Sequence, residues 1–172
     1  MFLKRFKEKS IQKYYRTVLS SPRTAIHQNK IRSVGVLLNY DEYNNYDKLR
    51  FILKDIGIKD NRVKFLALIS DEKSVPNHWD AFFYPECFGW KGKFEHVELE
   101  EFVTTPFDAL ISFYNEERWE LNLVTALSKA NFKIGISDYE PRLFDLIINI
   151  ETKHIDVFHG ELIKYLKRLN KI

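Results

Sequence analysis

The sequence predicts an α/β fold, a single Rossmann-like domain of three layers with a mostly parallel sheet, preceded by a basic amphipathic N-terminal helix. The first observation is the stretch 107–137, in which a segment of helical spacing separates two short apolar runs, residues 109–113 and 132–136. The second is a similar pattern over residues 34–69. Short, nearly continuous apolar runs are typical of parallel strands covered on both faces, and the helix between them makes a right-handed crossover.

Residues 2–19 have the pattern of a basic amphipathic helix, because apolar side chains recur at mostly helical spacing and basic side chains fill the remainder. Ser20, Ser21 and Pro22 end this helix, and residues 23–30 are predicted to be a linker. The sequence leaves open whether the apolar stripe packs on the domain or is free to bind. The stripe contains Phe2, Leu3, Phe6, Ile11, Tyr14, Tyr15, Val18 and Leu19.

The first βαβ unit is predicted to have strands at 34–38 and 63–69. The helix between them has Asn45 as a plausible N-cap and Gly57 as a C-cap. The turn after the first strand, residues 39–47, contains no glycine and three acidic side chains. Glycine-rich turns at this position bind nucleotide phosphates in related folds, so we do not expect a phosphate here.

The segment 77–94 breaks the periodicity and is rich in aromatic side chains. We predict short strands at 81–84 and 94–97, paired as an antiparallel edge, and one helical turn at 98–103. Aromatic side chains beside glycines form stacking platforms for bases or sugars in some proteins. The alternative is a loop held to the core by its own aromatic side chains. Trp90 is expected on the surface in either case, together with the neighbouring lysine.

The remaining part of the chain is predicted to complete the sheet and cover it. The turn 114–118 is polar and free of glycine, and Pro141 prevents a continuous helix after the strand at 132–136. We expect the last strand at 146–150 and a terminal helix at 155–169. The buried stripe of that helix is predicted to contain Val157, Phe158, Leu162, Ile163, Leu166 and Leu169.

Charge is distributed unevenly along the 172 residues. Residues 1–32 contain nine basic side chains and one acidic one, a net charge of +8, whereas residues 33–172 contain 18 basic and 23 acidic side chains, a net charge of −5. We therefore divide the chain into a basic helix with linker, 1–32, and an α/β domain, 33–172. The N-terminus lacks an apolar core of signal-peptide length and the only cysteine is Cys87, so a cytoplasmic protein is expected.

No motif for catalysis or for a cofactor is recognisable. The five histidines form no pattern of metal ligands, and there is no nucleophile elbow. We therefore expect no metal, no cofactor and no catalytic residue, and Cys87 is interpreted as a small hydrophobic side chain.

Three groups of residues are candidates for binding. An anionic partner would contact the cations Lys4, Arg5, Lys7, Lys9, Lys13 and Arg16. A ligand loop would be formed by Trp79, Trp90 and Lys91. Acidic side chains follow three predicted strands, and parallel strands would bring them to one edge of the sheet, where they could hold Mg²⁺ or a cationic partner. This acidic rim consists of Asp41, Glu42, Glu116, Glu117 and Asp138.

Two resemblances accompany these patterns. In the stretch 107–137, a strand with an aspartate is followed by a helix and by a strand that ends in glycine before a small residue, which is similar to the N-terminal domain of heptosyltransferase-like GT-B glycosyltransferases. The chain is too short for that family's second domain, so no donor-binding or catalytic residue is transferred. The whole chain, including the segments PECFGWKGK, TALSKANFKIGI and YLKRLNKI, resembles a family of uncharacterised bacterial proteins found in Bacteroidota.

Three functions compete on this basis. The first is a non-catalytic binding module whose basic helix, within residues 1–32, docks on an anionic assembly, with RNA such as the ribosome preferred. The second places the same helix on the inner surface of an anionic membrane. The third is a small or degenerate enzyme domain that handles nucleotides or sugars. A protein partner is a further possibility.

Overall fold

The structure, a computed structural model, describes residues 1–76 and 80–172. Within these residues one all-parallel sheet of six strands has the order β3-β2-β1-β4-β5-β6. This is the strand order of doubly wound, Rossmann-type folds, so the predicted α/β class is confirmed. The strands are β1 (Val34–Asn39), β2 (Val63–Leu68), β3 (Ala81–Phe83), β4 (Ala109–Phe113), β5 (Phe132–Gly135) and β6 (Leu146–Ile147).

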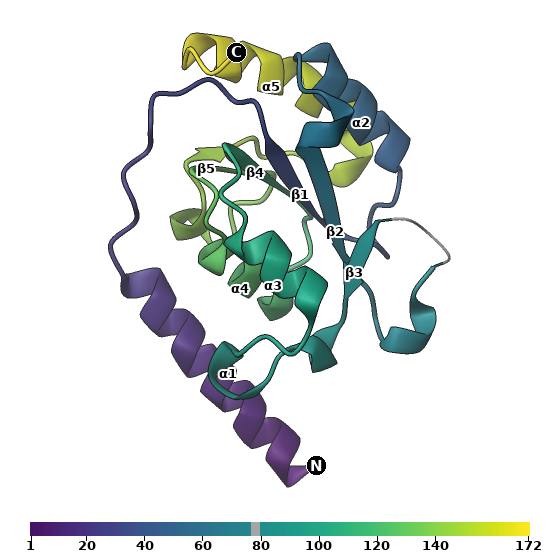
Figure 1. Cartoon of the computed structure of the whole chain (residues 1–172), viewed down its shortest axis with the longest axis vertical. Coiled ribbons are helices and arrows are strands. Elements are labelled where there is room, and N and C mark those ends of the chain that lie inside the picture. Colours follow the sequence, from purple (N-terminus) through teal and green to yellow (C-terminus); the bar gives the residue numbers. More distant parts are fainter. Residues whose placement is uncertain (77–79) are drawn as a thin grey trace.

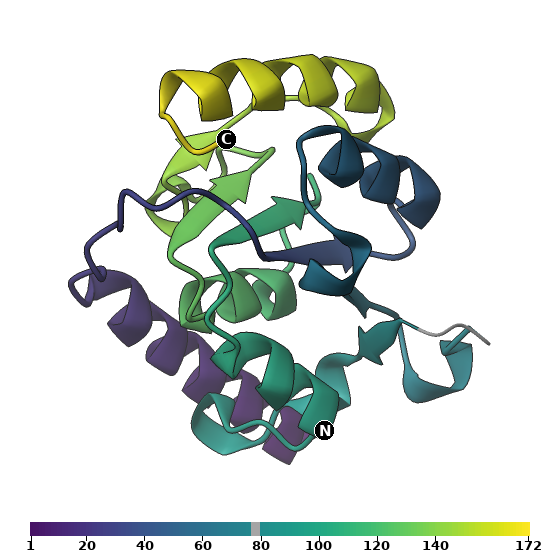
Figure 2. The ribbon, with the colours of Figure 1, turned by 45° about the horizontal axis from the view of Figure 1, so that its top comes forward.

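Helices cover both faces of the sheet (Figures 1 and 2). Helices α2 and α5 lie on one face, α3 and α4 lie on the other, and α1 runs along the outside of the α4 side. The bounds are α1 (Phe2–Ser20), α2 (Tyr46–Asp55), α3 (Val97–Thr104), α4 (Trp119–Leu127) and α5 (Ile155–Arg168).

The central strand β1 contributes side chains to two hydrophobic cores, one on each face of the sheet. Val36 and Leu38 are fully buried in the core beneath α2 and α5, whereas Leu37 is fully buried in the core beneath α3 and α4. Successive side chains of a strand point to opposite faces, so a strand covered on both sides is apolar at every position. This explains the continuous apolar runs in the sequence.

The predicted ends of α2 are confirmed. Asn45 is the N-cap, and its side-chain oxygen accepts a hydrogen bond from the backbone N–H of Lys48 at 3.1 Å. Gly57, just beyond the helix, has a φ of +90°, a conformation that other residues adopt only with strain. The local sequence therefore determines where this helix begins and ends.

The predicted strand pairing in the aromatic segment is wrong. β3 pairs in parallel with β2, and not as an antiparallel edge with residues 94–97. Phe94 makes only an isolated antiparallel bridge to Phe88, and the eight-residue helix α3 begins at Val97. Residues 81–83 complete the edge of the main sheet, so the antiparallel backbone contacts of residues 94 and 95 are made with residues 87 and 88 instead, and Phe88 is fully buried in the core.

Strand β6 is shorter than predicted, and the buried stripe of α5 contains fewer residues than predicted. Strand β6 has two residues, and Val157 and Leu169 in the region of α5 are 53% and 44% exposed. The side chains of α5 that face the sheet recur at intervals of three and four residues, and Val157 falls outside that row. Leu169 continues the spacing of the row but lies just beyond the last residue of α5. Ile163 is partly exposed, and the buried row is Ile155, Phe158, Leu162 and Leu166.

Candidate anionic-partner interface

Helix α1 is docked on the domain. Ile11 is only 2% exposed and belongs to the core on the α3 and α4 side, with Tyr14 and Tyr15 packed beside it. The helix contacts α4 and the short turn Trp90–Gly92. The question that the sequence left open is therefore answered in favour of packing, whereas the boundary between residues 32 and 33 stays a prediction.

At Gly92 the backbone of the turn lies against the side chain of Tyr14 on α1. The φ of Gly92 is +72°, and a Cβ atom added there would lie 2.6 Å from Cδ1 of Tyr14. We expect Gly92→Ala to lower the free energy of unfolding by about 2 to 4 kcal/mol, from a strained backbone and an overpacked contact. Urea denaturation measures this. Gly160→Ala in α5, where no atom lies within 4 Å of the added Cβ, is the control and should raise stability slightly.

The outward face of α1 carries a row of four cations. Arg5, Lys9, Lys13 and Arg16 follow one another at intervals of four, four and three residues, which places them on one side of a helix over about 16 Å. All four are exposed, and none forms an ion pair within the described residues. Nothing in this part of the chain neutralises them, so their charge is directed at solvent or at a partner.

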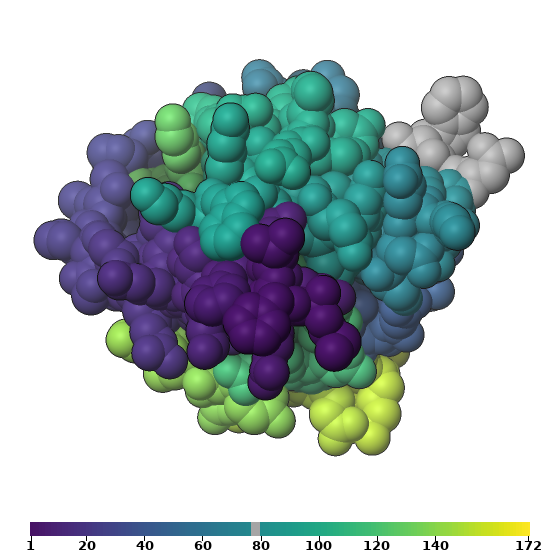
Figure 3. Space-filling model, turned by 90° about the horizontal axis from the view of Figure 1, so that it is seen from below, coloured from purple at the N-terminus to yellow at the C-terminus, as the bar shows by residue number. Residues whose placement is uncertain are grey.

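Exposed apolar side chains occupy the N-terminal tip of the same helix. Phe2 is 79% exposed and Phe6 is 52% exposed, with ring centroids 5.6 Å apart, and Leu3 is 74% exposed. Figure 3, viewed from the end where the N-terminus lies, shows these first turns at the surface. These three residues of the apolar stripe therefore do not take part in the packing, because the first turns of the helix extend past the surface on which Ile11 packs.

The predicted ligand loop lies beside this tip. A groove of about 350 Å³ runs between α1 and the loop, and Trp90, which is 51% exposed, forms part of its wall with Trp119. Lys4 and Lys7 line the same groove. Lys91 is exposed with a φ of 57°, as expected for a surface turn, whereas Trp79 lies outside the described residues.

The acidic rim is assembled at the carboxyl edge of the sheet, as predicted from parallel strands, but four of its five members have internal partners. Asp41 accepts a hydrogen bond from the hydroxyl of Ser70 at 3.0 Å. Glu116 accepts one from the side chain of the buried Asn39 at 3.1 Å, and Asp138 accepts one from Asn149 at 3.1 Å. Glu117 follows Glu116 in the turn after β4. No group of three or more metal-ligating side chains occurs among residues 1–76 and 80–172.

Glu42 fills the position where Rossmann-type folds bind ligands. Its carboxylate accepts hydrogen bonds from the backbone N–H groups of Asn115 at 2.6 Å and Glu116 at 3.2 Å, at the point where the strand order reverses between β1 and β4. Burial raises the pKa of Glu42, and these two hydrogen bonds oppose that effect. The carboxylate thus pairs with two backbone N–H groups that face this crevice. The neighbouring cavity, between residues 114–117 and 137–144, is about 10 Å³, roughly the room for one water molecule.

Asn115 ties this edge to the C-terminal part of the chain. Its side-chain N–H₂ donates to the carbonyl of Ile150 at 2.7 Å, and its oxygen accepts from the N–H of Thr152 at 2.8 Å. We expect Asn115→Ala to lower the free energy of unfolding by about 2 kcal/mol, because two backbone groups lose their partners. Hydrogen exchange at Thr152 checks the mechanism, and unchanged exchange there would contradict it. Asn149→Ala, at an exposed neighbouring position, serves as the control.

The row of cations could have been found in the sequence, whereas the fold-back of Glu42 could not. Residues 5, 9, 13 and 16 share a helical face whenever the segment is a helix. By contrast, the sequence around Glu42 is that of a polar turn, in which an acidic side chain is expected to face solvent. Only the folded chain brings Glu42 against the backbone of residues 115 and 116.

The fold and this interface define a class: an α/β protein of Rossmann strand order that carries a docked helix with an exposed basic face. Within the described residues no helix combines the length and the apolar character needed to cross a membrane. A family model for the "Family of unknown function (DUF6913)" matches residues 7–169, and the chain belongs to this family. No curated protein and no solved structure matches the chain. The similarity to glycosyltransferases stays a prediction.

Proposed function

We propose that the protein is a non-catalytic α/β binding module that is anchored to an anionic assembly by the outward face of α1, with RNA such as the ribosome as the preferred partner. The observation that carries this proposal is the row Arg5, Lys9, Lys13 and Arg16, exposed and without ion pairs in the described chain, on a helix already fixed to its domain. Cations of this kind gain affinity by releasing counterions from phosphates.

Docking of α1 makes the row a prepared surface. A disordered basic arm must lose conformational entropy when it binds, whereas this helix is held by Ile11 and Tyr14 before any partner arrives. The exposed rings of Phe2 and Phe6 lie beside the cations and offer flat surfaces on which unpaired bases stack. Both features favour RNA with single-stranded regions.

Sedimentation of the tagged full-length protein from native lysate tests the proposal. We expect comigration with ribosomes at low salt, and release by nuclease or by high salt. Migration as a free small protein under all conditions would overturn it. The full chain is required, because removal of residues 1–20 would expose the core residues that Ile11 and Tyr14 cover.

A second candidate partner, the surface of an anionic membrane, is favoured by the apolar tip. Met1 and Leu3 are 106% and 74% exposed, and a short apolar tip beside lysines can enter the headgroup layer while the cations meet anionic lipids. Flotation with vesicles of phosphatidylglycerol and phosphatidylcholine separates the two partners. Recovery with the vesicles and absence from ribosomal fractions would select the membrane.

We also infer a bacterial origin, within the Bacteroidota, and a cytoplasmic location. The resemblance of the segments PECFGWKGK and YLKRLNKI to proteins of that group supports the first, and the presence of a single cysteine, which suits a reducing compartment, supports the second. Fractionation of cells that express the tagged chain tests the location.

A further inference from the structure

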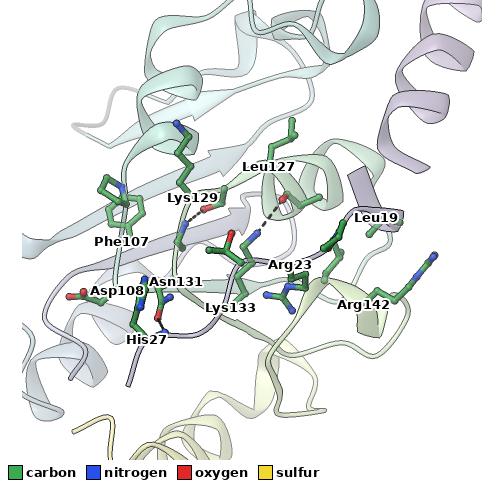
Figure 4. A pocket seen from close by; sticks show the side chains of 17 residues that line it. Leu19, Arg23, His27, Phe107, Asp108, Leu127, Lys129, Asn131, Lys133 and Arg142 are labelled. Atoms are coloured by element: carbon green, nitrogen blue, oxygen red, sulfur yellow. Dashed lines mark hydrogen bonds between the residues drawn. The ribbon is translucent and has the colours of Figure 1, made fainter. Parts of the chain in front are cut away.

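A cavity of about 670 Å³ lies at the amino-terminal edge of β4 and β5, away from the cation row of α1 (Figure 4). Its walls come from the end of α1, the segment 22–27, and the residues that precede β4 and β5. The volume is in the range of small-molecule sites, and apolar side chains such as Leu127, Phe107 and Leu143 line it together with several polar groups.

Lys133 is the unusual member of this lining. Only 7% of the residue is exposed, and its ammonium group donates one hydrogen bond, to the carbonyl of Ala126 at 3.1 Å. It forms no ion pair with any described residue. Burial lowers its pKa to about 8, so the group is still mainly protonated at neutral pH. A buried cation with one of three donors satisfied is expensive unless something else pairs with it.

The nearby carboxylates are engaged elsewhere. Asp108 accepts hydrogen bonds from the backbone N–H groups of Arg32 and Ser33, each at 2.9 Å. Asp145 accepts a hydrogen bond from the backbone N–H of Lys133 and pairs with Arg23, both at 2.8 Å, so it does not meet the ammonium group. The charge that Lys133 presents to the cavity is therefore left for a ligand.

Hydrogen bonds hold the segment 22–27, which forms one wall of the cavity. The backbone N–H of His27 donates to Asn131 at 3.0 Å, and Asn131 donates to the carbonyl of Ala25 at 3.2 Å. The side chain of Lys171 donates to the carbonyl of His27 at 2.6 Å. Lys129 is an exposed residue at the rim, and Figure 4 shows its side chain directed away from Lys133. Among the described lining residues, Lys133 is thus the buried cation that no carboxylate pairs with. Arg23 pairs with Asp145 through one guanidinium nitrogen and has further N–H donors for a ligand, whereas Arg142 pairs with Glu140.

We propose that this cavity binds a small molecule with an oxyanion group, a phosphate or a carboxylate, which contacts Lys133 and Arg23, and with an apolar body that contacts Leu127 and Phe107. The oxyanion supplies acceptors for the unused donors of Lys133, and the apolar body fits the remaining wall. This site is independent of the interface on α1, so its failure and that of the proposed function are separate results.

Thermal unfolding of the full chain tests the site with three probes of similar shape: phenyl phosphate, benzoate and benzyl alcohol. At about 10 mM, a probe with a dissociation constant of about 1 mM should raise the melting temperature by about 4 °C. We expect this from phenyl phosphate or benzoate, whose comparison distinguishes the two oxyanions, and not from benzyl alcohol. Lys133→Met should abolish the effect, and Lys129→Met should keep it.

Backbone amide NMR shifts during titration with phenyl phosphate and benzoate locate the binding. Shifts for the effective probe at residues 23–27 and 127–133 are expected. The proposal is overturned if neither anion stabilises the protein, if benzyl alcohol acts equally, or if Lys133→Met responds like the wild type. It is also overturned if the shifts are confined to residues 4–16, because the anion would then bind only the basic helix.

Discussion

Reversing the four charges of the cation row, by Arg5→Glu, Lys9→Glu, Lys13→Glu and Arg16→Glu together, is expected to abolish binding of a labelled oligouridylate RNA. If the four cations contact four phosphates, the wild-type affinity should fall with salt at a slope of about −3 on logarithmic axes, which is roughly a 50-fold loss between about 50 and 200 mM salt. Fluorescence anisotropy over this salt range measures both effects.

The control for this variant reverses four exposed cations elsewhere: Lys59→Glu, Arg62→Glu, Lys73→Glu and Lys167→Glu. It has the same net charge as the test variant, so equal loss of RNA binding in both would show that overall charge, and not the row on α1, attracts the RNA. Because the row is exposed and unpaired in the described chain, the test variant should remain folded, and circular dichroism confirms this before binding is measured.

Lys133→Met is expected to raise the free energy of unfolding at pH 7 by about 1 to 2 kcal/mol. A pKa lowered to about 8 corresponds to a destabilisation on the order of 3 kcal/mol at neutral pH, and the lost hydrogen bond to Ala126 offsets part of the gain. Urea denaturation at pH 7 measures the difference. Lys129→Met, at an exposed position, should change stability by no more than about 0.5 kcal/mol.

The pH dependence of this advantage has a defined sign. The pKa of Lys133 is lower in the folded chain than in the unfolded chain, so its destabilisation is fully present below about pH 8 and is relieved as pH rises toward the unfolded value. The advantage of the methionine variant should therefore shrink between pH 8 and about pH 9.5. Buried tyrosines such as Tyr46, whose pKa burial raises, act in the opposite direction above about pH 10, so the comparison stops before that point.

Such a variant would separate stability from binding. If replacing Lys133 by methionine raises the free energy of unfolding and abolishes ligand binding, the lysine lowers stability but is needed for binding. This is the behaviour expected of a functional residue. If Lys133 had a purely structural role, its substitution would instead lower the free energy of unfolding. A fall in stability for Lys133→Met at pH 7 would therefore count against the cavity as a binding site.

The central part of the fold could be predicted from the sequence because its signals are local. The apolar runs of β1 and β4 and the helical spacing of α2 and α5 identify the elements, and Asn45 identifies where a helix begins. Side-chain periodicity depends only on the backbone geometry of the element itself, so no knowledge of distant contacts is needed. The confirmed α/β class follows from these signals.

The edges of the fold could not be predicted in the same way. The segment 94–97 has the composition of a strand, yet its neighbour β3 is already paired with β2. The exposure of Phe2 and Phe6 likewise depends on where the surface beneath α1 ends, not on the spacing of apolar residues in the helix. Pairing partners and the extent of a docking surface are properties of the assembled chain.

The sequence by itself determined the central strands and helices of this protein, the excess of positive charge in its first 32 residues and the row that this charge forms on a helix. Only the tertiary structure decided that α1 docks with this row outward, that Glu42 occupies the usual ligand position, and that Lys133 is buried beside a cavity. The physical reason is that helical spacing is fixed by a few neighbouring residues, whereas burial and pairing depend on groups brought together from distant parts of the chain.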